Sequence, residues 1–406
     1  MSKPKIRFKG FIEDWEQRKF SELVTIERGG SPRPIDKFIT NDENGLNWVK
    51  IGDAPEQGNY ITQTAEKIRP EGLSKTREVH PGDLILSNSM SFGRPYIMAI
   101  DGCIHDGWLA IRDTKKNFDL KFLCTLLGTD GMLNQYKAMA AGSTVNNLNK
   151  ELVGGTTVAF PMVEEQIKIG DYFTTIDHLI TLHQRKYEEM KKFKKCMLQK
   201  MFPQNGKNIP EIRFEGFTED WEQRKLGDIL ERRVEQRQQS EEYPRLAFAS
   251  GQGVIPLSER RTNNREQLIK DEFTKKYLVT EMDDIVYNPA NVKYGAIDRN
   301  KCGRGLISPI YVTFTTNEIS GFIERIVTSH DFQQKALRFE EGTVTKRQSV
   351  NPEDFITIDI VVAPQREEQK KISDYFDQLD HLITLHQRKY EELQKIKKFM
   401  LQNMFI

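Results

Sequence analysis

Side chains that can make sequence-specific hydrogen bonds with nucleic acid gather in five polar segments of this chain. Arg, Lys, Asn and Gln can bind the edges of bases through paired hydrogen bonds, and Ser and Thr can bind phosphates. The segments are Arg28–Arg33, Asn88–Arg94, Ser143–Asn147, Asn288–Tyr294 and Thr343–Ser349. A polar loop taken alone is most often an ordinary solvated loop, so these segments gain meaning only from the elements that position them.

Catalytic motifs are incomplete throughout the chain. The Gly206-Lys pair is followed by Asn208, where a phosphate-binding P-loop requires Ser or Thr. The segment Asn288-Pro-Ala-Asn lacks the second proline and the aromatic residue of the DNA adenine methyltransferase tetrad. Neither HExxH nor GxSxG occurs. We therefore expect no catalytic residue and no metal site in this chain.

The elements around the polar segments occur twice. Ile6–Lys19 returns as Ile212–Lys225 with 12 of 14 residues identical, and Asp177–Glu189 returns unchanged at Asp380–Glu392, 203 residues later. A period this long indicates two homologous domains in tandem rather than a solenoid. The segments between these repeats differ, which suggests one scaffold that carries two specificities.

Each half ends in a long helical segment, and each domain body mixes strands with helices. Glu165–Phe202 and Glu368–Phe405 carry apolar residues at heptad spacing, which predicts a coiled coil of roughly 50 Å. A pseudo-twofold relation between the halves predicts antiparallel helices. His183 and His386 occupy equivalent core positions, where a polar pair that fixes the register is favoured over metal ligands. The Lys-rich helix ends are read as a solvated face, with phosphate contact as the alternative.

Composition limits the possible classes of protein. The 406 residues include 60 Lys plus Arg and 59 Asp plus Glu, so a net charge of +1 excludes a polybasic nucleic-acid coat but allows a locally basic face. No apolar run reaches the roughly 20 residues of a membrane span, and the N-terminus lacks the apolar segment of a signal peptide. Four scattered cysteines predict reduced thiols in a cytoplasmic protein.

Taken in order, the motifs resemble the specificity (S) subunit of Type I restriction-modification enzymes. The first half carries GGSPRP, WVKIGD, GSTV and P-x-x-EEQ running into the long helix. The second half carries DIVYNPANVKYGAI, GLISPIYVTF, GTVTKRQSVNPEDF and APQREEQ. Each motif alone is weak, but their joint occurrence in order, twice, covers nearly the whole chain.

The resemblance implies an α+β fold with two tandem target-recognition domains of mixed structure, separated by a pair of long antiparallel coiled-coil helices. The expected parts are target-recognition domain 1 (1–163), a central spacer helix (164–203), target-recognition domain 2 (204–366) and a C-terminal spacer helix (367–406). Each domain is expected to read one half of a bipartite site in double-stranded DNA.

The same resemblance implies partners that perform the chemistry. They are two methyltransferase (M) subunits, which bring S-adenosylmethionine, and two restriction and translocation (R) subunits, which use ATP and Mg²⁺. The chain itself is expected to be non-catalytic, to bind no cofactor and to have no membrane partner.

We expect the DNA contacts to come from the polar loops. The expected residues are Ser31, Arg33, Asn88, Ser89, Arg94, Thr144, Asn146, Asn288, Asn291, Lys293, Tyr294, Lys346, Arg347 and Gln348. Two alternatives stay open at this point: a stand-alone DNA methyltransferase or nuclease with unrecognised motifs, and a coiled-coil scaffold without a DNA role.

Overall fold

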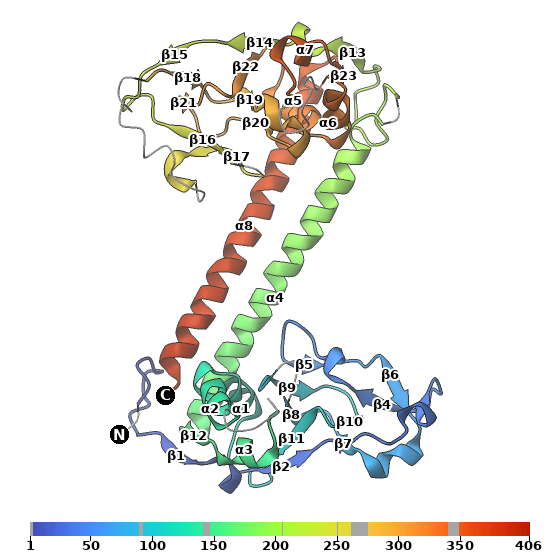
Figure 1. Cartoon of the computed structure of the whole chain (residues 1–406), viewed down its shortest axis with the longest axis vertical. Helices are drawn as coiled ribbons and strands as arrows, with labels where there is room; N and C mark the ends of the chain where they lie inside the picture. The colour runs from blue at the N-terminus through green and yellow to red at the C-terminus, as the bar shows by residue number, and fades with distance from the viewer. Residues whose placement is uncertain are drawn as a thin grey trace. The chain divides into compact units, whose positions relative to one another are not determined.

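The computed structural model describes residues 3–88, 92–140, 147–204, 206–249, 251–260, 275–339 and 349–406. The chain divides into two compact units (Figure 1). Unit 1 comprises Met1–Tyr187 with Leu385–Ile406, and unit 2 comprises Glu188–Thr384. Each unit therefore contains one domain body together with a segment of each long helix.

Unit 1 is built on two five-stranded sheets. Their strand orders are β2-β11-β8-β9-β5 and β3-β6-β4-β10-β7, and β1 pairs separately with β12. The strands are β1 (Glu16–Lys19), β2 (Thr25–Arg28), β3 (Ile39–Thr40), β4 (Leu46–Val49), β5 (Tyr60–Ile61), β6 (Glu66–Ile68), β7 (Arg77–Val79), β8 (Leu84–Ser87), β9 (Pro95–Met98), β10 (Gly102–Ile104), β11 (Trp108–Arg112) and β12 (Thr157–Phe160). The helices are α1 (Leu120–Leu127), α2 (Asp130–Ala140), α3 (Lys150–Gly155) and α4 (Val163–Lys200).

Unit 2 repeats the central part of this plan. The order β14-β22-β19-β20 matches β2-β11-β8-β9, and smaller sheets β15-β18-β21, β16-β17 and β13-β23 surround it. The strands are β13 (Glu222–Lys225), β14 (Leu230–Arg233), β15 (Gln236–Arg237), β16 (Leu246–Ala249), β17 (Gly253–Pro256), β18 (Tyr277–Thr280), β19 (Ile285–Tyr287), β20 (Ile297–Arg299), β21 (Gly305–Ile307), β22 (Val312–Thr316) and β23 (Asp359–Val362). The helices are α5 (Ser320–Val327), α6 (His330–Leu337), α7 (Pro352–Phe355) and α8 (Arg366–Met404).

Strand β8 shows how the sequence builds these cores. Successive side chains of a strand point to opposite faces of the sheet. Leu84 and Leu86 accordingly pack into the cluster that contains α1, while Ile85 packs on the other face with Tyr96 and Trp108. All four residues of β8 are buried, so the sheet has a core on both faces.

The segment from Phe118 to Met139 carries apolar residues spaced for one helical face, but it does not form a single helix. Helix α1 ends at Leu127 and α2 begins at Asp130, because the Thr129 hydroxyl accepts a hydrogen bond from the backbone of Met132 and starts a new helix. Unit 2 breaks at the equivalent place, where Ser329 caps α6. Short polar residues compete for backbone hydrogen bonds in this way at helix starts.

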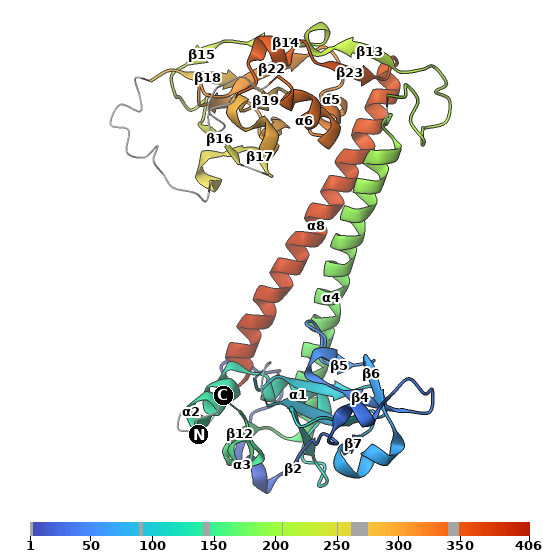
Figure 2. The ribbon, with the colours of Figure 1, turned by 45° about the vertical axis from the view of Figure 1, so that its right-hand side comes forward.

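Within each unit the two long helices run side by side in opposite directions (Figures 1 and 2). In unit 1, Asp177 of α4 pairs with Lys397 of α8 at 2.5 Å, and in unit 2, Lys194 of α4 pairs with Asp380 of α8. These ion pairs confirm the predicted antiparallel arrangement. They also show that two of the lysines at the Lys-rich helix ends bind the partner helix.

The repeated signatures fasten each domain body to both long helices. In unit 1, the Ile6 N–H donates to the Asn403 carbonyl near the end of α8, and the Arg7 guanidinium binds the buried Glu165 carboxylate near the start of α4 at 2.7 Å. Unit 2 repeats the pattern, with Ile212 donating to Lys200 and Arg213 binding the buried Glu368. The identity of the repeated segments therefore follows from a shared structural task.

The glutamine that follows each buried glutamate has a similar task. Gln166 accepts a hydrogen bond from the Asp119 N–H at the start of α1, and Gln369 accepts one from the Ile319 N–H at the start of α5. Each amide also donates to the carbonyl of a residue shortly before its own helix.

None of the helices in the described part of the chain has the length and the apolar character of a membrane span.

Candidate nucleic-acid interface

Three of the predicted DNA-contacting residues of unit 1 converge on one aspartate. The Ser31 hydroxyl donates to Asp106 Oδ1 at 2.8 Å, and an Arg33 guanidinium nitrogen lies 3.8 Å from Asp106 Oδ2. The Asn88 side-chain amide donates to the Asp106 carbonyl oxygen at 2.8 Å. The structure thus joins two segments that are far apart in the sequence into one polar group, which we call the Asp106 group (Ser31, Arg33, Asn88 and Asp106).

Asp106 lies in the tight turn between β10 and β11. The Trp108 N–H closes this turn on the His105 carbonyl at 3.1 Å. Burial would raise the pKa of the Asp106 carboxyl, but the Ser31 hydrogen bond and the nearby His105 and Arg33 outweigh it, so the pKa is lowered. The carboxylate is therefore held ionised and remains 41% exposed.

Members of the Asp106 group differ in exposure. The Arg33 side chain is 78% exposed and can reach a ligand in solvent. Asn88 is only 2% exposed, and its backbone also binds the carbonyl of Gly107 and the N–H of Leu148. Asn88 therefore supports the surrounding loops, whereas Arg33 and Asp106 face outward.

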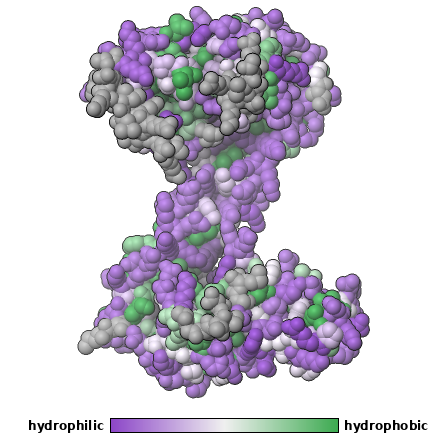
Figure 3. All heavy atoms as spheres, in the orientation of Figure 1, coloured by the Kyte–Doolittle hydropathy of each residue, from purple (hydrophilic) through white to green (hydrophobic). Residues whose placement is uncertain are grey.

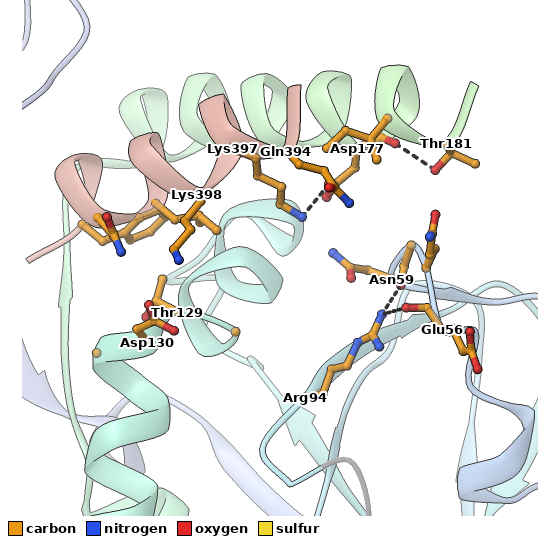
Figure 4. A pocket seen from close by; sticks show the side chains of 18 of the residues that line it. Glu56, Asn59, Arg94, Thr129, Asp130, Asp177, Thr181, Gln394, Lys397 and Lys398 are labelled. Atoms are coloured by element: carbon orange, nitrogen blue, oxygen red, sulfur yellow. Dashed lines mark hydrogen bonds and ion pairs between the residues drawn. The ribbon is translucent and has the colours of Figure 1, made fainter. Parts of the chain in front are cut away.

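Arg94 lies apart from these contacts. Its guanidinium donates to the carbonyls of Glu56 and Gly58 at 2.9 and 3.1 Å and packs over the Tyr96 ring. Figure 4 shows it at the wall of an open cavity of about 840 Å³ in unit 1, together with residues of the long helices such as Lys398. The structure therefore gives Arg94 a role in holding the 56–58 loop.

In unit 2 the segment Asn288–Tyr294 forms a short 3₁₀ helix, η8 (Pro289–Tyr294), with Asn288 as its cap. The Asn288 side-chain oxygen accepts a hydrogen bond from the Ala290 N–H at 3.1 Å, and the residue is 9% exposed. Asn291 and Tyr294 are exposed, Tyr294 to 70%. The Asn-Pro dipeptide is thus a helix start, which removes the resemblance to a methyltransferase tetrad.

The remaining expected contacts cannot be placed. Ser89, Thr144, Asn146, Lys346, Arg347 and Gln348 lie outside the described residues. The backbone of Lys293 belongs to η8, but its side chain is not among those described. Asp106 was missed by the sequence reasoning, although the Asp-Gly pair between two apolar runs is a strong signal for a tight turn.

The chain is similar to several known proteins. Residues 12–192 match the family model described as Type I restriction modification DNA specificity domain. The MjaX and MjaVIII specificity subunits of type I restriction enzymes from Methanocaldococcus jannaschii are each 23% identical to this chain over 95% of its length and 91% of theirs. Over nearly its whole length, this chain is therefore similar to Type I restriction enzyme specificity subunits.

The crystal structure of the Type I restriction-modification S subunit from M. genitalium has the same fold. It matches with a TM-score of 0.64 over 100% of this chain and 99% of that chain, at 14% identity. Specificity subunits are non-catalytic recognition subunits, and the family implies no cofactor of its own. This role agrees with the incomplete catalytic motifs, so a stand-alone methyltransferase or nuclease is not favoured.

Proposed function

We propose that this specificity subunit reads a bipartite site in double-stranded DNA, with one half-site assigned to each domain body. The observation that carries the proposal is that the two domain bodies share one structural frame, meaning the repeated elements that attach each body to the long helices, but carry different polar loops. The frames are the same, because Arg7–Glu165 and Arg213–Glu368 are equivalent buried pairs. The polar loops on those frames differ, so two different half-sites and a non-palindromic target follow.

Electrostatics supports local rather than global attraction to DNA. Phosphate contacts supply much of the affinity of DNA-binding proteins, while base contacts supply specificity. With a net charge of +1 the chain needs cationic groups placed on its loops, as with the exposed Arg33. Among the expected contacts that can be placed, we assign direct DNA contact to Arg33, Asn291 and Tyr294. We assign loop support to Asn88, Arg94 and Asn288.

The long helices supply a docking surface for partners. Most of the face shown in Figure 3 is hydrophilic, with isolated hydrophobic spots. In unit 1, Ile396 and Phe399 of α8 are 38% and 55% exposed. Their counterparts 203 residues earlier, Phe193 and Cys196 of α4, are exposed in unit 2, Phe193 to 50%. We call these the two helix-end patches, and each presents neighbouring positions at i and i+3 on one helix face.

Equivalent patches fit two copies of one partner. We assign them to two methyltransferase subunits, which supply S-adenosylmethionine, and place two restriction subunits with ATP and Mg²⁺ in the complete cytoplasmic complex.

The 38 residues of α4 correspond to roughly 57 Å of helix, enough for a spacer between half-sites about 34–36 Å apart. The proposed parts of the chain remain two recognition domains (1–163 and 204–366) and two spacer helices (164–203 and 367–406).

Methylation assays with purified components test this proposal. We expect the chain alone to transfer no methyl group from S-adenosylmethionine to DNA. Together with its methyltransferase partner, it should direct methylation to one sequence. Methyl transfer by the chain alone would support the enzyme alternative. A complex with the partner that binds no DNA would support the scaffold alternative.

A further inference from the structure

One turn occupies the same place on the two frames but carries different chemistry. In unit 1 it joins β10 to β11 and is closed by the hydrogen bond from Trp108 to His105. In unit 2 the turn joins β21 to β22, and the Tyr311 N–H donates to the Ser308 carbonyl at 3.0 Å. We call these the domain 1 turn (residues 105–108) and the domain 2 turn (residues 308–311).

Strand register shows that the two turns are equivalent. Leu86 of β8 lies opposite Leu109 of β11, and Tyr287 of β19 lies opposite Val312 of β22. The turns therefore precede matching strand positions and lie beside the ends of β8 and β19. Those strand ends lead directly into two of the polar segments, Asn88–Arg94 and Asn288–Tyr294.

The domain 1 turn is fastened to polar residues from several loops. The Asp106 carbonyl accepts hydrogen bonds from the side chains of Asn88 and Arg28, at 2.8 and 3.4 Å. The Asp106 carboxylate is held by Ser31 and lies near Arg33. This network fixes the position of a carboxylate that still has free acceptor capacity toward solvent.

The domain 2 turn presents an apolar surface instead. Pro309 and Ile310 stand where Asp106 and Gly107 stand in the domain 1 turn, and Ile310 is 62% exposed. The turn is anchored by the Tyr311 ring, which stacks on Phe248 with ring centres 5.8 Å apart. Exposure of the Ile310 side chain to water is unfavourable, so its burial against an apolar group of a ligand would be favourable.

A fixed carboxylate on a DNA-binding face needs a specific partner, because phosphates repel it. The exposed amino group of cytosine in the major groove is such a partner, and an apolar side chain can contact the methyl group of thymine. Resting on the function proposed above, we propose that this turn is a base-reading element in both domains. Asp106 accepts a hydrogen bond from a cytosine amino group in one half-site, and Ile310 contacts a thymine methyl in the other.

A purely supporting role for Asp106 makes a different prediction. If Asp106 only holds Ser31 and Arg33 in place, its loss should weaken binding to every sequence alike. If it reads a base, its loss should relax the preference at one position and leave the other positions unchanged. Methylation of a randomised DNA library by the complex of this chain with its methyltransferase, read by sequencing, separates the two roles.

The variants are Asp106→Ala and Ile310→Ala, with Asp101→Asn as the matched control. Asp101 is a carboxylate of the same unit that is 76% exposed and binds His80 rather than the Asp106 group. We expect Asp106→Ala to lower discrimination at one base pair roughly 5- to 150-fold, the range for one base contact. Ile310→Ala should relax one position in the other half-site, and Asp101→Asn should leave the motif unchanged.

Three results would overturn the inference. One is an unchanged motif with Asp106→Ala, and another is a change by both variants in the same half-site. The third is a uniform loss of methylation by a variant that still has native circular dichroism and still binds the methyltransferase, which indicates support alone. If the wild-type complex selects no motif at all, the proposed function fails, and the inference fails with it.

Discussion

The imidazole rings of His183 and His386 face each other between the two long helices, with their Nδ1 atoms 2.9 Å apart. The two residues hold the same position in the two copies of the repeat, 203 residues apart. One Nδ1 must donate and the other must accept, so at least one ring has to be neutral at that atom. The pair fits the role in helix register that the heptad pattern predicts.

This contact predicts a loss of stability in acid. Burial lowers the pKa of His386, and the neighbouring His183 and Lys186 lower it further. The folded protein therefore favours neutral His386 more than the unfolded chain does. Neutral His386 therefore contributes fully to the stability of the folded protein above the ordinary histidine pKa of about 6.5. This contribution is lost as the pH falls below that value. Thermal unfolding between about pH 8 and about pH 5 should show a smaller pH dependence for His386→Gln than for the wild type.

The exposed His381 provides the control for this measurement. It lies on the same helix, five residues away, and is exposed. His381→Gln should keep the pH dependence of the wild type. An equal reduction of the pH dependence in both variants would show that the contact between the rings contributes nothing specific.

The buried glutamate of each frame should be essential for stability. Glu165 is fully buried and binds Arg7, whose side chain is 13% exposed. Removing the Glu165 carboxylate leaves the mostly buried Arg7 guanidinium without an opposite charge beside it. We expect Glu165→Ala to lower the free energy of unfolding by about 3 kcal/mol, the lower end for such pairs because Arg7 keeps some contact with water. Denaturant unfolding should show little effect of Glu164→Ala, because Glu164 is exposed.

The contacts between domain body and long helix differ between the two units. In unit 2, Arg325 of α5 is 5% exposed and binds Asp377 and Asp380 of α8 at 2.6 and 2.9 Å. The equivalent region of unit 1 has Thr125 and Thr174, which line a cavity of about 230 Å³. Hydrogen exchange should therefore be faster in α1 than in α5, and Arg325→Thr should speed exchange in α5. Equal exchange in the two wild-type helices would contradict this expectation.

Cysteine labelling can test the docking proposal. Burial raises the pKa of Cys124 to about 12, so this thiol should resist alkylation. Cys196 and Cys302 are exposed, and Cys196 belongs to the helix-end patch of unit 2. Binding of the methyltransferase should protect Cys196 from a maleimide and leave Cys302 reactive. Labelling of Cys196 at the same rate in the complex would place the partner elsewhere.

The repeated and periodic parts of the fold could be predicted from the sequence. The identical segments predicted two domains and, through a pseudo-twofold relation, antiparallel helices, and the heptads predicted a coiled coil, because repeats and periodicity can be read directly from the order of residues. The frame pair between Arg7 and Glu165 joins residues 158 positions apart, and no local pattern indicates it. The breaks at Thr129 and Ser329 were also missed, since helix-starting hydroxyls are weak signals within apolar periodicity.

The candidate site was only partly accessible to sequence reasoning. Polar composition selected Ser31, Arg33 and Asn88, which the structure gathers around Asp106, but it could not separate the exposed Arg33 from the buried Asn88. Burial depends on packing between segments distant in the chain. Asp106 was overlooked because an acidic residue does not match the cationic pattern expected near DNA, although acidic residues can read bases.

A genome-wide map of methylated adenines, in cells with and without this chain, tests the central claim most directly. We predict methylation at one bipartite, non-palindromic motif in the presence of the chain, and complete loss of methylation at that motif when the chain is removed. Persistence of the same methylated motif without the chain would contradict the account, because another protein would then select the sequence.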